Sequence, residues 1–150
     1  MSTDEDLPHA EFAFPGPLRD ALVGAILDGR KTSTTSLAVE YARADEPLPI
    51  VGARQQVLDS AGRAVAVIET TGVRRVSLAE VDLDHARDEG EGYETVAEWR
   101  AGHENFWHSD QMRAALGEPG FTVRDDTLVV LERFRLVRRL QDGSGLGSAP

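Results

Sequence analysis

Cysteine is absent from this chain of 150 residues, and lysine occurs only once, as Lys31, among sixteen basic side chains. Without cysteine the chain can form no disulfide and no thiolate metal site. No apolar run is long enough to span a membrane, and the acidic segment 1–6 lacks the character of a secretory signal. These absences predict a cytoplasmic protein without membrane contact, and nothing in the sequence indicates an obligate protein partner.

Positive charge is scarce overall, because the formal net charge is −10. Proteins that bind long nucleic acids usually present a basic face, since contacts with phosphates supply much of the affinity. Five arginines gather in residues 124–139, whereas residues 80–98 hold eight carboxylates and one arginine. The charge pattern argues against tight binding of long duplexes and leaves room for a small ligand or a short single strand in a local cleft.

The length predicts one domain with one core. Residues 1–10 are mostly polar, and the last residues are rich in glycine and serine. We therefore predict disordered tails at residues 1–10 and 141–150 around a folded domain of residues 11–140.

Local patterns predict a mixture of helices and strands. Apolar spacing and a following glycine indicate a first helix, and capping boxes (Ser or Thr followed three residues later by Glu) indicate two more. Alternating β-branched and apolar residues indicate the strands. The expected elements are a helix at 18–28, a short strand or extended turn at 31–36, a hairpin at 54–58 and 63–71 continuing to 77, helices opening near 77 and at 96–116, and a strand at 127–137. This order predicts an α+β domain built on a small, mostly antiparallel sheet.

Lys31 stands directly before a run of hydroxyl residues, 32–36. A lysine ammonium can lose its proton when it is desolvated, whereas an arginine stays charged. Lys31 is therefore the one cation here that suits proton transfer. The alternative is that arginine-rich composition merely left one lysine, and that the hydroxyl run is an edge strand bonding its own backbone.

Several segments together resemble the ASCH family, small relatives of the PUA-like barrel found on RNA-associated proteins. The resemblance rests on Asp-Gly-Arg-Lys-Thr at 28–32, Leu-Pro-Ile-Val-Gly at 48–52, the strand 67–71, the segment 85–92, and the helix that contains 99–106. It covers residues 12–139 and is greatest for the longer, stand-alone bacterial branch. It implies a small PUA-like β-barrel with flanking helices, a cleft, and a link to RNA or modified nucleosides.

The resemblance also implies a site. Some relatives are described as ribonucleases, and shorter ones as amidohydrolases that remove an acyl group from N4-acylated cytidine through a Lys, a Thr and a Glu. Carried onto this chain by motif, these residues are Lys31, Thr34 and Glu89.

For amide hydrolysis, Thr34 would be the nucleophile, a neutral Lys31 its base, and Glu89 the group that protonates the leaving nitrogen. For RNA cleavage, a charged Lys31 would stabilise the transition state. Glu89 would then activate the 2′-hydroxyl or hold a divalent cation such as Mg²⁺ or Mn²⁺. In a straight strand Lys31 and Thr34 face opposite sides, so Ser33 and Thr35 are the alternative hydroxyls.

Further candidates surround this set. Arg54, Arg74 and Arg75 could contact phosphate, and Trp107, which lies off the apolar stripe of its helix, could stack on a base. The i,i+4 pairs His85/Glu89 and Glu104/His108 each resemble half a metal site, but neither has a third ligand nearby in sequence. We therefore predict no transition-metal site.

Three functions remain open at this stage. The resemblance to the bacterial branch favours a ribonuclease that cleaves single-stranded RNA, with Lys31 stabilising charge. The alternative is an amidohydrolase acting on N4-acetylcytidine-type nucleosides through Lys31, Thr34 and Glu89. The third is a non-catalytic module that binds RNA or a nucleotide.

Overall fold

A computed structural model describes residues 6–140 of the chain. Within them a five-stranded sheet has the order β1-β3-β4-β5-β2. The strand β1 pairs in parallel with β3, and all other neighbours are antiparallel. The strands are β1 (His9–Ala10), β2 (Ser33–Leu37), β3 (Arg54–Leu58), β4 (Ala64–Ser77) and β5 (Leu128–Arg139).

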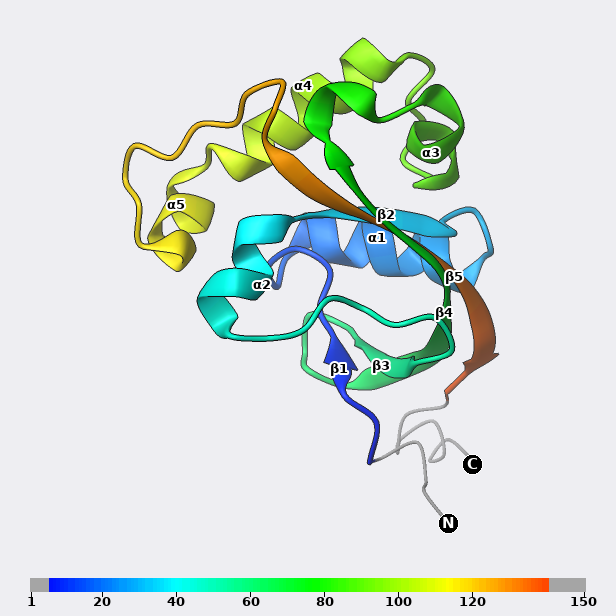
Figure 1. Cartoon of the computed structure of the whole chain (residues 1–150). Coiled ribbons are helices and arrows are strands. Elements are labelled where there is room, and N and C mark those ends of the chain that lie inside the picture. Colours follow the sequence, from blue (N-terminus) through cyan, green and yellow to red (C-terminus); the bar gives the residue numbers. More distant parts are fainter. Residues whose placement is uncertain (1–5, 141–150) are drawn as a thin grey trace.

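Five helices surround this sheet: α1 (Pro17–Leu27), α2 (Ala38–Ala44), α3 (Leu83–Asp88), α4 (Val96–Trp107) and α5 (Asp110–Leu116). Figure 1 shows α3, α4 and α5 together at one end of the molecule, with β1 and β3 at the other end and α1 between them. The edge strand β2 runs beside β5 between these two ends. This position lets β2 carry side chains toward both halves of the molecule.

Alternate residues of β5 supply two separate cores. Val129 and Leu131 pack in a cluster with residues of α3, α4 and α5, whereas Phe134 packs in a second cluster with residues of α1, β3 and β4. Because successive strand residues face opposite sides, Glu132 shares its face with Phe134. The site described below lies where these two cores approach each other along β2.

The α+β class and the mostly antiparallel sheet agree with the sequence prediction, but the expected closed barrel does not. The described sheet is open, with β1 and β2 as its two edges. The strand β1 is only two residues long, so it cannot reach across to β2 and close the sheet. It also lies inside the segment expected to be a disordered tail. The rest of that prediction, for residues 1–5 and 141–150, falls outside the described residues.

The helix expected over residues 96–116 is two helices. The first ends at Trp107, and the second begins after Ser109, whose hydroxyl accepts a hydrogen bond from Met112 N at 3.1 Å. A serine at this position is a helix start signal, and the sequence interpretation passed over it. The short helix α2 was also not predicted.

No helix within residues 6–140 is both long and apolar enough to cross a membrane.

Candidate active site

Two chain segments meet at the start of β2. Thr32 N donates to Asp88 O at 2.7 Å, and Ser33 Oγ donates to His85 O at 3.0 Å. Gly90 lies at this junction with a φ of +76°, and a Cβ there would come within 2.8 Å of the Arg30 and Lys31 backbone. Only glycine accepts both the left-handed conformation and this contact. The junction places Lys31 beside Glu89.

Lys31 is almost completely buried, with 2% of its surface exposed. Its Nζ donates to Ser33 O at 2.9 Å and to Glu89 O at 3.3 Å, and lies 3.9 Å from Glu89 Oε1. The ring centroid of Phe12 is 5.8 Å away. Burial lowers the pKa of Lys31, and the neighbouring carboxyl of Glu89 opposes that shift. The amine therefore sits in a dry site against one carboxylate.

Glu89 is the centre of the network. Thr35 Oγ1 donates to its Oε2 at 2.6 Å, His85 Nε2 lies 3.1 Å from the same oxygen, and His103 Nε2 lies 3.0 Å from Oε1. Burial alone would raise the pKa of this carboxyl. The hydrogen bonds from His103 and His85 and the charge of Lys31 outweigh burial and hold the pKa of Glu89 well below its usual range. Glu89 is therefore a carboxylate at neutral pH.

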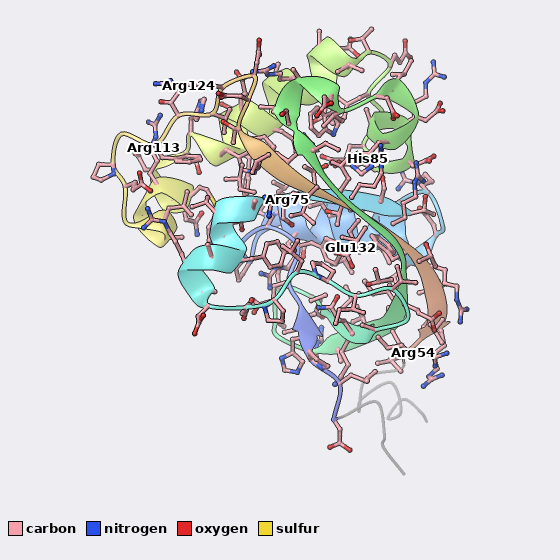
Figure 2. All side chains as sticks on the ribbon, viewed as in Figure 1. Arg54, Arg75, His85, Arg113, Arg124 and Glu132 are labelled. Atoms are coloured by element: carbon pink, nitrogen blue, oxygen red, sulfur yellow. The ribbon has the colours of Figure 1, made fainter. Side chains whose placement is uncertain are left out.

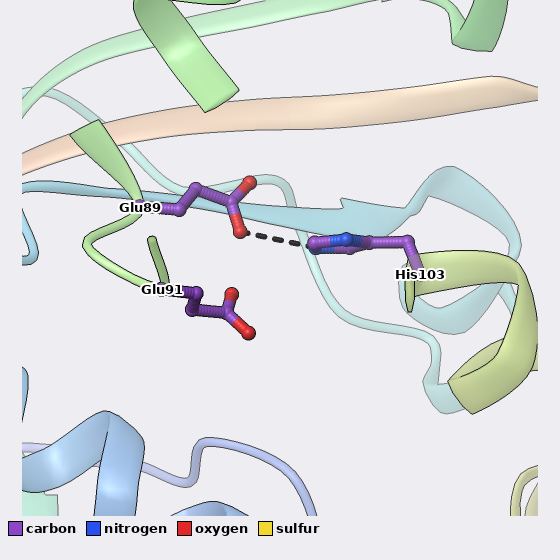
Figure 3. A group of neighbouring side chains, drawn as sticks. All are labelled: Glu89, Glu91 and His103. Atoms are coloured by element: carbon purple, nitrogen blue, oxygen red, sulfur yellow. Dashed lines mark hydrogen bonds and ion pairs between the residues drawn. The ribbon is translucent and has the colours of Figure 1, made fainter. Parts of the chain in front are cut away.

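His103 faces an acceptor with each ring nitrogen. Nδ1 lies 2.9 Å from Trp99 O, and Nε2 faces the Glu89 carboxylate (Figure 3). A carbonyl and a carboxylate can only accept, so both nitrogens carry protons and the ring is an imidazolium. Burial alone would lower the pKa of His103, but the bond to Glu89 raises it overall. The ring stacks on Trp99 with centroids 4.2 Å apart, which fixes its orientation.

Glu91 completes the group drawn in Figure 3, where its carboxyl lies on the same side as the Glu89 carboxyl and the His103 ring. Burial raises the pKa of Glu91, and the nearby Glu89 adds to this shift. One ligand atom each from Glu89, Glu91 and His103 lie within 4.8 Å of one another, so this trio could hold a divalent cation once His103 Nε2 has lost its proton. Lys31 and His103 already balance the charge of Glu89, so a cation is not required to stabilise the group.

This network forms part of the wall of a cleft of about 1000 Å³. Lys31, Thr35 and Glu89 line it, and the edge position of β2 lets Thr34, on the other face, line it too. Six glutamates, one lysine, one arginine and the imidazolium of His103 line the cleft, at positions 11, 40, 46, 89, 91, 132, 31, 19 and 103. The arginine is engaged by Phe12 O, Ala13 O and Glu11. The cleft therefore favours an uncharged ligand over a polyanion.

The structure brings two of the three residues carried over by motif into contact. Lys31 and Glu89 are neighbours, but Thr34 is paired in register with Glu132 on β5, and among the described residues no hydrogen bond joins it to Glu89. Thr35 is the hydroxyl bound to Glu89. The strand geometry thus favours the alternative hydroxyl named from side-chain alternation, because β2 does not bend enough to turn Thr34 toward Lys31.

Of the expected substrate-binding residues, the three arginines lie outside the cleft and Trp107 lies in its wall. None of Arg54, Arg74 and Arg75 is among the described residues that line the cleft. Arg54 pairs with Glu69 at 2.9 Å, and Figure 2 shows it at the end of the molecule away from His85. Trp107 lines the cleft but is only 2% exposed and packs edge-on against His103, so its ring offers no face to a base.

Sequence reasoning missed the central position of His103. Its helical stripe with Trp99 and Phe106 was interpreted as core, and the histidine inside that stripe was not connected with Glu89. Gly102 was a usable signal, because a Cβ there would collide with the hydroxyl of Tyr93. A glycine in the middle of a helix carries a cost in stability, and here it admits a tyrosine that lines the cleft.

The fold is α+β, with an open five-stranded sheet. A buried Lys–Glu–His network lies beside its edge strand β2 and forms part of the wall of the cleft. The chain belongs to the ASCH domain family, whose sequence model matches residues 11–138. A comparison with proteins of curated function gave no match.

Solved structures with the same fold include bacterial relatives. A protein from Enterococcus faecalis V583 is 25% identical, with a TM-score of 0.79 over 95% of this chain and 83% of that one. The ASCH domain from Lactobacillus crispatus JV V101 is 31% identical, with a TM-score of 0.71 over 89% and 82%. An ASCH protein from Zymomonas mobilis, at 12% identity, has a TM-score of 0.55 over 89% and 70% and shares the fold.

Proposed function

We propose that this ASCH protein is a hydrolase that removes the acyl group from a small, uncharged nucleoside of the N4-acylcytidine type. The observation that supports this proposal is the acidic cleft with the Lys31–Glu89–Thr35 network in its wall. RNA would bring several phosphates into contact with six glutamates, while the arginines expected to bind phosphate lie outside the cleft. The same observation weighs against the ribonuclease that the sequence favoured, and against an RNA-binding module.

In the proposed reaction, Thr35 Oγ1 attacks the acyl carbonyl carbon and passes its proton to Glu89 Oε2, with which it already shares a 2.6 Å hydrogen bond. The tetrahedral intermediate then collapses. The bond from the acyl carbon to N4 breaks, and N4 takes the proton from Glu89. Water hydrolyses the resulting acyl-threonine ester, which releases a carboxylic acid and restores the hydroxyl. The low pKa of Glu89 favours this return of the proton.

Lys31 stabilises the oxyanion in this scheme. Two of its N–H groups are engaged by carbonyl oxygens, and a third remains for the cleft when the amine is protonated. Burial lowers the pKa of Lys31, and Glu89 Oε1, 3.9 Å from Nζ, opposes that shift by attracting the charged form. Because charge is what is needed, Lys31→Arg should keep activity above that of Lys31→Ala, with a loss of about ten- to a thousandfold through misplacement.

The test offers the purified protein N4-acetylcytidine and short single-stranded RNAs in parallel, with and without a chelator. We expect cytidine and acetate to be released, RNA to stay intact, and the chelator to have no effect. Lys31→Ala should abolish the release. Because it also leaves Glu89 without its buried cation, we expect a lower melting temperature, and circular dichroism at the assay temperature checks that the variant is folded. RNA cleavage without deacylation would replace this proposal with a ribonuclease. Tight RNA binding with no turnover of either substrate would replace it with a binding module.

A further inference from the structure

A second polar group lies on the other face of β2 and has no part in the chemistry proposed above. Glu132, on β5, is only 7% exposed and lines the cleft. It faces Thr34 directly across the strands, in register. Figure 2 places Glu132 toward the middle of the molecule.

The two oxygens of Glu132 differ in their surroundings. Oε2 accepts a hydrogen bond from Thr70 Oγ1 at 2.7 Å. Within residues 6–140, Oε1 has no hydrogen-bond partner, although it is not sealed off from the cleft. Nearly all buried polar atoms in proteins are satisfied by protein, water or ligand. An acceptor left open on a cleft wall therefore indicates a donor that arrives with the ligand.

Three residues with hydroxyl groups, Thr34, Ser36 and Tyr41, line the cleft together with Glu132. Thr34 and Ser36 share one face of β2, and the hydroxyl of Tyr41 donates to Ser36 Oγ at 3.4 Å. The electrostatic influence of Glu132 reaches Tyr41, so the two lie near each other. A carboxylate beside neutral hydroxyls suits vicinal hydroxyls of a sugar, as in dinucleotide-binding proteins where an acidic residue binds the ribose 2′-hydroxyl.

We propose that Glu132 and Thr34 form a ribose subsite, in which Glu132 Oε1 accepts from a ribose hydroxyl of the nucleoside. This inference rests on the proposed function and extends it. Different parts of the substrate then contact the two faces of β2. The acyl group lies at Thr35 and Glu89, and the sugar lies at Thr34 and Glu132. The carboxylate also disfavours nucleotides, because a phosphate on the sugar would approach a buried negative charge.

Binding of two unreactive nucleosides tests the subsite without any need for turnover. Calorimetry compares cytidine with 2′,3′-dideoxycytidine, which lacks the 2′- and 3′-hydroxyls and keeps the 5′-hydroxyl. The wild type should prefer cytidine by about ten- to a hundredfold, the range expected for a hydrogen bond to a charged group. In Glu132→Gln the preference should fall to about a few-fold. Glutamine keeps the side-chain volume and can still accept from Thr70, so the fold should be retained.

Glu46→Gln is the matched control, because Glu46 also lines the cleft but is exposed. It removes the same charge and should keep the preference for cytidine. If Glu132→Gln unfolds, Thr34→Val tests the same subsite from the edge strand and should lose part of the preference.

The outcomes separate the two proposals. Deacylation by a wild type that binds both nucleosides equally, or a preference that survives in Glu132→Gln, would overturn the subsite and leave the hydrolase. A preference lost in Glu132→Gln, in a protein that does not deacylate, would support the subsite and overturn the hydrolase. Failure to bind either nucleoside would overturn the subsite, and together with the absence of deacylation it would overturn both proposals.

Discussion

Two groups of charged side chains in this molecule behave in opposite ways. Around Glu89, a lysine and two histidines converge on one carboxylate, and Lys31 and Glu89 are each 1% exposed. Near the far end of β4, Glu69 pairs with Arg54 at 2.9 Å and Arg135 at 3.2 Å, and these side chains are 23% to 52% exposed. The charges and distances are similar, but the access of water is not.

This difference decides what each group can do. Water and salt screen the exposed pairs, so they contribute little and could be exchanged without consequence. The buried group is desolvated, which shifts the pKa values of its members. Each charge is therefore stabilised mainly by its partners in the group and not by water. Perturbed, buried ionisable groups in a cleft are typical of functional sites. We therefore infer that the Glu89 network is a functional site and that the ion pairs of Glu69 are ordinary surface ion pairs.

The largest expected effect comes from disturbing the junction that holds the buried group together. Gly90→Ala forces an L-residue into positive φ and drives its Cβ against the Arg30 and Lys31 backbone. We expect a loss of about 2–4 kcal/mol in the free energy of unfolding, measured by urea titration.

Gly92→Ala is the control for that prediction, because Gly92 also has positive φ, +87°, but a Cβ there meets nothing within 4 Å. Its cost should be only the conformational part, about 1–2 kcal/mol. Equal losses in the two variants would mean that the junction does not need the close approach of Gly90.

A smaller effect should appear as a dependence of stability on pH. The pKa of His103 is raised in the folded protein, so its stabilisation is complete below the unfolded value near 6.5 and is lost as pH rises through the folded value. The pKa of Glu89 is depressed, so its part is present above about 4.5 and lost as pH falls further. His103→Gln should therefore cost about 1–2 kcal/mol near pH 6 and less near pH 9.

The measurement is urea unfolding of both proteins at the two pH values. His9→Gln is the control, because His9 lies exposed in β1 and its replacement should leave the pH dependence unchanged. A cost of His103→Gln that is the same at pH 6 and pH 9 would contradict the imidazolium assignment.

The smallest effect is expected at the exposed group. Arg135→Ala removes one of two arginines from Glu69, and the remaining Arg54 stays bonded to the same oxygen. The change in stability should be too small to resolve by denaturant titration, and added salt should reduce it further. A clear loss of stability would show that exposure does not separate the two groups as argued.

Much of the fold followed from local sequence signals. Helix α1, the β3–β4 hairpin and β5 were predicted from apolar periodicity, because each buries one face against a core. The open sheet was not predicted, since closure depends on how far the short strand β1 reaches. The break between α4 and α5 depended on one capping residue, Ser109, inside an otherwise continuous helical pattern.

The site was predicted in part, for a physical reason. Lys31 and Glu89 carry motif signals, and alternation along β2 already raised Thr35 as a partner. His103 lies 14 residues beyond Glu89 on a separate helix, so only the packing of α4 brings its ring to the carboxylate. Long-range contacts of this kind have no local pattern in a single sequence.

Turnover of N4-acetylcytidine by two matched variants tests the central claim most directly. Thr35→Val and Thr34→Val remove neighbouring hydroxyls from opposite faces of β2 with nearly equal change in shape. The account predicts that Thr35→Val lowers kcat by at least about a hundredfold, because the nucleophile bound to Glu89 is lost, whereas Thr34→Val mainly raises KM. Loss of kcat in Thr34→Val, with normal turnover in Thr35→Val, would contradict it.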